Sequence, residues 1–387
     1  MDSIPRKANR VGIAILIAGL VAATSSAGPP ADPRPAGTWN PKAAAAYLDQ
    51  RADWWMAWPA TRLDEGTFCI SCHTAMPYAV ARPALRGELG EQGPTPGEAR
   101  LLESVTARVR GWARTRPFYD DNNGANKAAE SRGTESVLNA LILVNRDARS
   151  GKLSDDTRTA FDHLWALQQT AGDAKGSWRW LDFAHEPFEA ADSGYWGACL
   201  AALATGMAPE NYRAAPAIQE HLAPLREYLN GQRGRQSVIN QVALLWASTK
   251  LPGLLSPAEQ KAILDEVVSQ QRSDGGWSLS SLSWTWRGTS MGSLVRLWIR
   301  SNDSPVAPKT DGYATGLIVY TMQQMGVPRT DPHVMRGLAW LSTHQSPTEG
   351  SWPGYSLNNR RDPSSKTGLF MVDAATAYAV LALTAGH

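Results

Sequence analysis

Apolar residues recur along most of the chain at the three- and four-residue spacing of an α-helix, and no segment alternates as a β-strand would. The helical segments are of two kinds. One kind is amphipathic and is predicted to lie outside; the other is apolar almost all round, contains small residues and is predicted to be buried. DSGYWGACLAALATG, DGYATGLIVYTMQQMG and DAATAYAVLALTAG are of the second kind. The pattern predicts an all-α protein of paired outer and inner helices.

A repeated motif follows the outer helices. Three of them end in glutamine, continue through a polar turn that contains glycine, and reach a tryptophan: Gln168 with Trp178, Gln271 with Trp277, and Gln345 with Trp352. We expect the glutamine to bond unsatisfied carbonyls at its own helix end, and the indole N–H to be paired while the ring packs on the turn. Weaker copies fill the intervening segments, so that about six helix pairs follow one another along the chain.

Six pairs joined head to tail favour a closed ring over an open helical solenoid. A solenoid exposes two apolar ends, and neither end of this pattern resembles a polar cap. We therefore expect one α/α toroid, with parallel inner helices, over residues 41–387.

The Gln…Gly-x-Trp units resemble the QW motifs of squalene-hopene and oxidosqualene cyclases, within the superfamily of terpenoid cyclases and protein prenyltransferases. The resemblance covers the chain from about Lys42 onward and implies the toroid fold. The cyclases of that family start their reaction with an Asp-x-Asp-Asp run or an Asp-Cys pair, and the prenyltransferases hold zinc with Asp, Cys and His. This sequence has none of these arrangements. The resemblance therefore predicts the fold rather than cyclase activity.

The N-terminus has the layout of a secretory signal peptide. Arg6, Lys7 and Arg10 precede the apolar run VGIAILIAGLVAAT, and small residues follow up to Ala27. That run is about 14 residues, short of the roughly 20 that span a bilayer. We expect a signal peptide over 1–27, cleaved rather than retained as an anchor, and a disordered proline-rich segment over 28–40. The mature chain would be periplasmic, without a transmembrane segment.

Cys69-Ile-Ser-Cys72-His73 fits C-x-x-C-H, the attachment sequence of haem c. Two thiols at this spacing form thioethers with the haem vinyl groups, and His73 binds the iron. Haem is attached after export in bacteria, so the motif and the signal peptide require the same compartment. A Cys69–Cys72 disulfide, a zinc site and simple packing are the other interpretations. Cys199, on an apolar helix, is predicted to be a buried thiol.

A second iron ligand has to come from a distant residue, because Met76 lies one turn beyond His73 on the same helix face. In a closed ring the last inner helix neighbours the first, so Met371 would lie at the same rim as His73. We expect Met371 to be the distal ligand. The alternatives are Met291, His185 and His344.

Single acidic residues mark the inner helices, namely Asp192, Asp311, Asp373 and Glu135. Helix N-capping explains aspartate at such positions. The functional interpretation is an acidic ring on one rim of the cavity, for proton donation or ligand binding. The pair Asp120–Asp121 is predicted to form a turn, with calcium binding as the alternative.

The charges are balanced, with 38 Lys and Arg against 36 Asp and Glu, which argues against a nucleic-acid partner. The combined hypothesis is an exported haem c protein for electron transfer with a redox partner protein, or for oxidation of an apolar, isoprenoid-like substrate or lipid. A haem-free cyclase or lyase that uses the rim carboxylates is one alternative, and a non-catalytic lipid- or glycan-binding module is another. Tryptophans are expected to line the cavity, unless they serve packing alone: Trp180, Trp196, Trp284 and Trp286.

Overall fold

The structure is a computed structural model that describes residues 38–283, 309–357 and 361–386. Within these ranges the chain forms α-helices, short 3-10 segments and two isolated β-bridges, and no named strand. The prediction of an all-α fold is confirmed. The expected signal peptide lies outside the described residues, as do Trp284, Trp286 and Met291.

Six helices form an inner ring. In chain order they are α2 (Ala75–Leu89), α4 (Lys127–Ser150), α6 (Ser193–Met207), α8 (Val238–Ser248), α12 (Gly312–Gln324) and α14 (Phe370–Thr384). Each contacts the next one, and α14 contacts both α12 and α2, which closes the ring. Small residues allow close packing between these helices: a Cβ on Gly316 of α12 would lie 2.5 Å from the Ala379 nitrogen of α14.

The outer helices alternate with the inner ones along the chain. They are α1 (Pro41–Ala57), α3 (Pro96–Arg110), α5 (Asp155–Ala166), α7 (Pro216–Gln232), α9 (Pro257–Ser269) and α13 (Pro332–Thr343), and a short α10 (Leu279–Leu282) follows α9. Of the six outer helices, all but α5 begin with proline, which suits the first helical position because its missing N–H needs no partner there.

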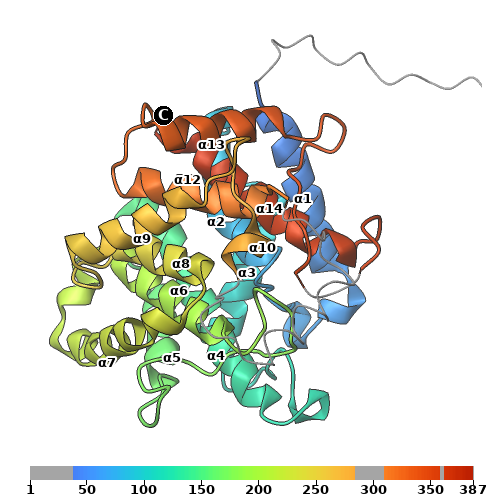
Figure 1. Cartoon of the computed structure of the whole chain (residues 1–387). Helices are drawn as coiled ribbons and strands as arrows, with labels where there is room; N and C mark the ends of the chain where they lie inside the picture. The colour runs from blue at the N-terminus through green and yellow to red at the C-terminus, as the bar shows by residue number, and fades with distance from the viewer. Residues whose placement is uncertain (1–37, 284–308, 358–360, 387) are drawn as a thin grey trace, which may run out of the picture. The chain divides into compact units, whose positions relative to one another are not determined.

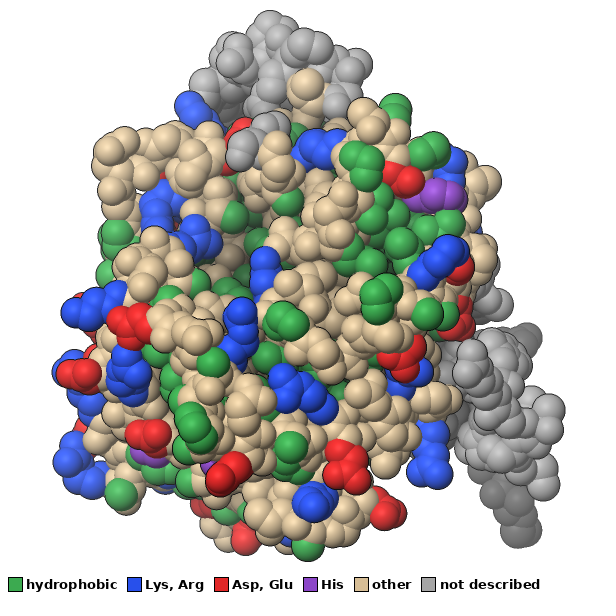
Figure 2. Space-filling model, turned by 90° about the vertical axis from the view of Figure 1, so that its left-hand side faces the viewer, with side chains coloured by type: hydrophobic (Ala, Val, Ile, Leu, Met, Phe, Trp, Pro, Cys, Tyr) green, Lys and Arg blue, Asp and Glu red, His purple; other side chains and the backbone are tan. Residues whose placement is uncertain are grey.

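Acidic and basic side chains mix over the face in Figure 2.

The glutamine of each motif connects one outer helix to the next. Gln168 Nε2 donates to the carbonyl of Gly176 in its own turn (3.1 Å) and to the carbonyl of His221 in α7 (2.9 Å). Gln271 repeats both bonds in the following motif. The expectation that glutamine bonds the end of its own helix is therefore wrong.

The tryptophan satisfies that helix end instead. Each indole N–H donates to a carbonyl in the last turn of the preceding outer helix, at 2.7 to 2.8 Å, in the pairs Trp178–Leu164, Trp277–Val267 and Trp352–Leu341. The hydrogen bond expected for the indole N–H is confirmed. Because its acceptor lies in the last turn of the preceding helix, the tryptophan can be separated from that helix only by a short turn.

Gln345 connects the last outer helix, α13, to the first. Its Nε2 donates to the Asn40 carbonyl (3.0 Å), and the Asn40 N–H donates to its Oε1 (2.5 Å). Asn40 is also the N-cap of α1. The turn glycine is required, because Gly350 has a φ of +76° and a Cβ there would lie 2.4 Å from the Ala43 carbonyl oxygen. Figure 1 shows α1 beside α14, and the closed α/α toroid is confirmed.

One stretch of the described chain, Thr367–Thr384, is long and apolar enough to cross a membrane by composition, but 67% of it is buried inside the structure. It contains α14, an inner helix of the ring. Burial against α12 and α2 accounts for its apolar surface.

Replacing Gln345 with alanine should destabilise the ring, because it removes the bonds that join α13 to α1. We expect Gln345→Ala to lower the free energy of unfolding by about 1–3 kcal/mol, measured by urea denaturation. Gln92→Ala is the matched control, since Gln92 bonds the Gly90 carbonyl at an exposed position. Equal losses in the two variants would contradict a role for Gln345 in ring closure.

Candidate functional site

A cavity of about 270 Å³ lies at the end of the ring where α2 and α14 begin. The segments that precede α2, α4, α6 and α14 all contribute to its walls, as expected if the inner helices are parallel. Aromatic side chains form a large part of the walls, namely Trp55, Trp58, His73, Tyr119, Phe183, Phe188 and Phe370. Trp180 and Trp196, expected in the walls, are absent from this lining and pack edge to face at 5.7 Å.

The Cys-x-x-Cys-His segment directly precedes α2. Trp55 Nε1 donates to the Cys69 carbonyl (2.7 Å), and Ser71 Oγ accepts from the Ala75 N–H (2.9 Å), which fixes the start of the helix. Cys69 and His73 line the cavity, whereas Cys72 is 1% exposed and does not line it. The two thiols therefore have different surroundings.

All three cysteines are free thiols in the structure. Burial raises the pKa of Cys69 and Cys72 well above its ordinary value, and the charge of Glu189 raises both further. Both thiols are consequently protonated at neutral pH, and a protonated thiol is a poor nucleophile and metal ligand. Cys199 is buried in the core, as predicted.

His73 is held in one orientation. Its ring stacks on Phe370 with centroids 3.7 Å apart, and its Nδ1 lies 2.8 Å from Thr74 Oγ1. Thr74 donates its hydroxyl to Asp373 Oδ2 (2.6 Å), so Nδ1–H is the donor to Thr74 and Nε2 is left as an acceptor. Burial, and then the charge of Arg361, lower the pKa of His73, so the imidazole is neutral.

Met371, in the first turn of α14, lines the same cavity as His73. Ring closure thus brings together the two residues that the sequence analysis placed at one rim. His185 also lines this cavity, whereas His344 stacks on Trp340 of outer helix α13 at 4.3 Å. Iron ligation by Met371 stays a prediction.

The four acidic residues expected at the rim do not line the cavity. Asp192 is exposed at the start of α6, and Asp311 caps α12 by accepting from the Ala314 N–H (2.8 Å). Glu135 is buried against Arg108, with Nε 2.5 Å from Oε1. Asp373 bonds Arg51 Nε at 2.6 Å. The structure does not bring these carboxylates together, and their catalytic role stays a prediction.

Asp120 belongs to a turn. Its side chain accepts from the Asn122 N–H and caps the 3-10 segment Asp121–Asn123. Turn formation, the predicted role of this acidic pair, is confirmed.

The sequence analysis missed the carboxylates that do line the cavity, Glu186 and Glu189. They lie on a hairpin between Trp180 and α6, in which the His185 and Glu189 backbones bond each other. Trp180 Nε1 donates to the Phe188 carbonyl (2.8 Å) and fixes this hairpin. The available signal was two glutamates and three aromatic rings within WLDFAHEPFE.

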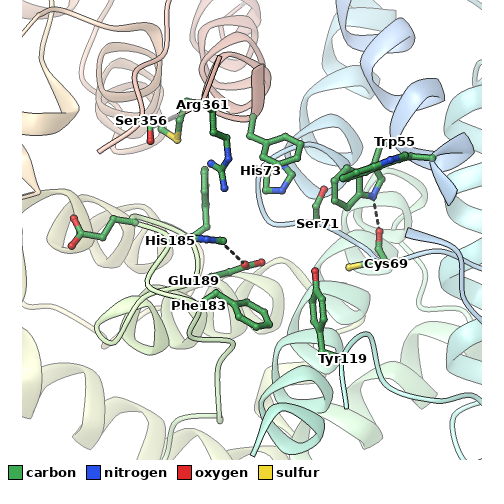
Figure 3. A pocket seen from close by; sticks show the side chains of 15 residues that line it. Trp55, Cys69, Ser71, His73, Tyr119, Phe183, His185, Glu189, Ser356 and Arg361 are labelled. Atoms are coloured by element: carbon green, nitrogen blue, oxygen red, sulfur yellow. Dashed lines mark hydrogen bonds and ion pairs between the residues drawn. The ribbon is translucent and has the colours of Figure 1, made fainter. Parts of the chain in front are cut away.

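Glu189 extends into the middle of the cavity, between Tyr119, Arg361 and His73 (Figure 3). Its carboxylate lies 3.8 Å from His185 Nδ1, and its side chain is 16% exposed. Burial raises the pKa of Tyr119, and the charge of Glu189 raises it further, so its phenol is neutral. The cavity therefore combines aromatic faces with carboxylates, one guanidinium and neutral hydroxyl donors.

No protein-family model and no curated protein matches the chain. Solved structures similar to it include a glycosidase variant in complex with glucose, at 13% identity with a TM-score of 0.45. Two further glycosidase variants match at 13% identity with TM-scores of 0.47 and 0.46. Each alignment covers 88% of this chain and 98% of the other.

The prediction of a haem protein for electron transfer or oxidation is wrong. Within the described residues, no group of three or more His, Cys, Asp or Glu could hold a metal ion. The physical reason is the setting of the motif, since Cys72 is buried in the core and does not border the cavity that Cys69 and His73 line. The resemblance to terpenoid cyclases extends to the toroid alone. Export and the expected partner molecules stay predictions.

Covalent attachment of haem c to Cys69 and Cys72 is a separate prediction that these findings leave open to test. If attachment occurs, protein exported from a host that matures c-type cytochromes will carry the extra mass of haem, which acidified acetone will not remove. The measurement is intact mass. The double variant Cys69→Ala/Cys72→Ala should lose that mass, and Cys199→Ala should keep it. An unchanged wild-type mass excludes attachment.

Asp311 should make stability depend on pH. Burial raises its pKa to about 7 in the folded protein, whereas an unfolded chain ionises this carboxyl near 3.9. Between these values the folded protein binds the extra proton, so the free energy of unfolding falls as pH rises. We expect the contribution of Asp311 to the free energy of unfolding to fall by up to about 4 kcal/mol between about pH 4 and 7. Above that range it should be constant.

The measurement is urea denaturation of wild type and Asp311→Asn across this range. The free energy of unfolding of the wild type, minus that of Asp311→Asn, should fall by up to about 4 kcal/mol between about pH 4 and 7. Asp173→Asn, at an exposed position, is the control and should not alter the pH dependence. A pH-independent difference for Asp311→Asn would refute the assignment.

Proposed function

We propose that the cavity binds a short carbohydrate and that the protein hydrolyses a glycosidic bond there. The observation that carries this proposal is one cavity that is walled by aromatic rings and lined by two glutamates, Glu186 and Glu189. Glycoside hydrolysis ordinarily needs such a pair: one carboxyl protonates the leaving oxygen, and the other attacks the sugar or activates water.

The aromatic rings suit the faces of a sugar. A pyranose presents C–H groups above and below its ring, and these pack on the flat faces of Trp, Tyr and Phe. Trp54 and Trp58 stack at 5.1 Å, and Trp58 continues this surface into the cavity beside Trp55. The volume, about 270 Å³, lies near the lower limit of small-molecule sites, about 300–1,000 Å³, which fits a short saccharide.

The polar groups can fix the orientation of the sugar. Tyr119 and Ser71 supply hydroxyls, Arg361 supplies a guanidinium, and His73 presents Nε2 as an acceptor. Such a small number of placed polar groups in an apolar cavity is typical of specific ligand sites.

Glu189 is the carboxylate assigned to the reaction centre, because the other polar groups surround it. Its backbone is fixed by the pairing with His185, and the Phe188 carbonyl beside it is bonded to Trp180. A carboxylate on a fixed backbone can keep the distance to the scissile bond that proton transfer requires.

Replacing Glu189 with glutamine should slow hydrolysis strongly while leaving the cavity shape intact. The experiment measures release of the aryl group from a panel of aryl glycosides. We expect Glu189→Gln and Glu186→Gln each to lower kcat by about 10²–10⁴-fold while saccharide binding, measured by calorimetry, is retained. Glu88→Gln, at an exposed position of α2, is the control and should match wild type. If the wild type cleaves none of the glycosides, the proposal fails.

A further inference from the structure

A second cavity, of about 220 Å³, lies at the other end of the ring. The C-terminal parts of the six inner helices and the residues just after them form it. Its buried floor is apolar, from Leu141, Leu203 and Leu381, with Trp246 and Tyr320 beside them. Its more exposed polar residues include Arg149, Lys250, Gln324 and Thr384.

The charge of this lining is entirely positive. Arg149 and Lys250 line the cavity, and among the described residues no aspartate or glutamate does. Lys250 Nζ donates to Gln324 Oε1 (2.8 Å), a neutral acceptor. Burial lowers the pKa of the Lys250 ammonium, so this cation gains from an anionic partner.

Trp246 contributes an unused donor. It is 4% exposed, and its Nε1–H has no hydrogen-bond partner among the residues that the structure describes. A buried N–H without an acceptor destabilises the folded protein, and a ligand that accepts from it removes that cost. Trp246 lies in the last turn of α8 and Lys250 lies two residues after its end, and both line the cavity.

Helix-end electrostatics explains only part of this arrangement. Arg149 lies in the last turn of α4, where a cation interacts favourably with the helix dipole. The dipole does not require a cavity, an apolar floor or an unpaired indole N–H. These features fit a ligand with an acceptor-rich anionic group and a compact apolar body.

We propose that this second cavity binds a small organic carboxylate. The carboxylate accepts from Trp246 Nε1–H and pairs with Lys250 and Arg149, and the apolar body packs on the leucine floor. The residues involved are separate from those of the aromatic cavity, so this site can exist whether or not the protein hydrolyses glycosides.

Benzoate is a suitable probe, and benzyl alcohol is its neutral counterpart. Titration calorimetry on the full chain should show saturable binding of benzoate and at least tenfold weaker binding of benzyl alcohol. In ¹⁵N-labelled protein, benzoate should shift the indole N–H resonance assigned by its loss in Trp246→Phe. Absence of benzoate binding, or equal affinity for benzyl alcohol, overturns the proposal.

The variants Lys250→Gln and Arg149→Gln should each weaken benzoate binding about tenfold. Lys152→Gln, an exposed lysine in the turn after α4, is the matched control and should bind as wild type does. Arg149 is exposed, so its replacement tests the site without disturbing the core. Unchanged affinity in both variants would contradict the assignment of the cations.

Discussion

The fold depends on one recurring interaction, a glutamine amide that bonds a turn carbonyl and a carbonyl of the next outer helix. Both acceptors of the amide are backbone carbonyls, so these bonds do not depend on which side chains surround them. In its last occurrence it joins Gln345 to Asn40, across 305 positions of sequence. A contact of that separation closes a long loop, and the packing of the helices between its ends has to offset the entropy that closure costs. Together with the bond between Arg51 and Asp373, which spans 322 positions, it closes the ring through contacts between residues far apart in the sequence.

Ring closure also separates two kinds of chemistry. Parallel inner helices gather their N-termini at one end and their C-termini at the other, with opposite helix-dipole charge. The segments before the inner helices bring aromatic rings and glutamates to the first end. The second end has short connections, and cations such as Arg149 and Lys250 line its cavity. The same architecture thus supports two cavities that differ in polarity.

The fold was predictable from sequence because its determinants are local and repeated: glutamine, glycine and tryptophan at similar spacing. Closure also allowed His73 and Met371 to be placed at one cavity. Glu189 was not predictable, since its hairpin is positioned by tertiary contacts such as Trp180 to the Phe188 carbonyl. The prediction of a haem protein for electron transfer or oxidation is wrong for a related reason. Five residues specify an attachment pattern, but the burial that decides what Cys72 can reach comes from the rest of the chain.

The bond between His73 and Thr74 connects the cavity to the place where α1, α2 and α14 contact one another. Thr74 precedes α2, Asp373 belongs to α14, and Arg51 of α1 holds the same carboxylate. One series of buried hydrogen bonds therefore links the contact between α1 and α14 to the imidazole that lines the cavity. A displacement of α14 relative to α1 would therefore disturb the bonds that orient the His73 imidazole.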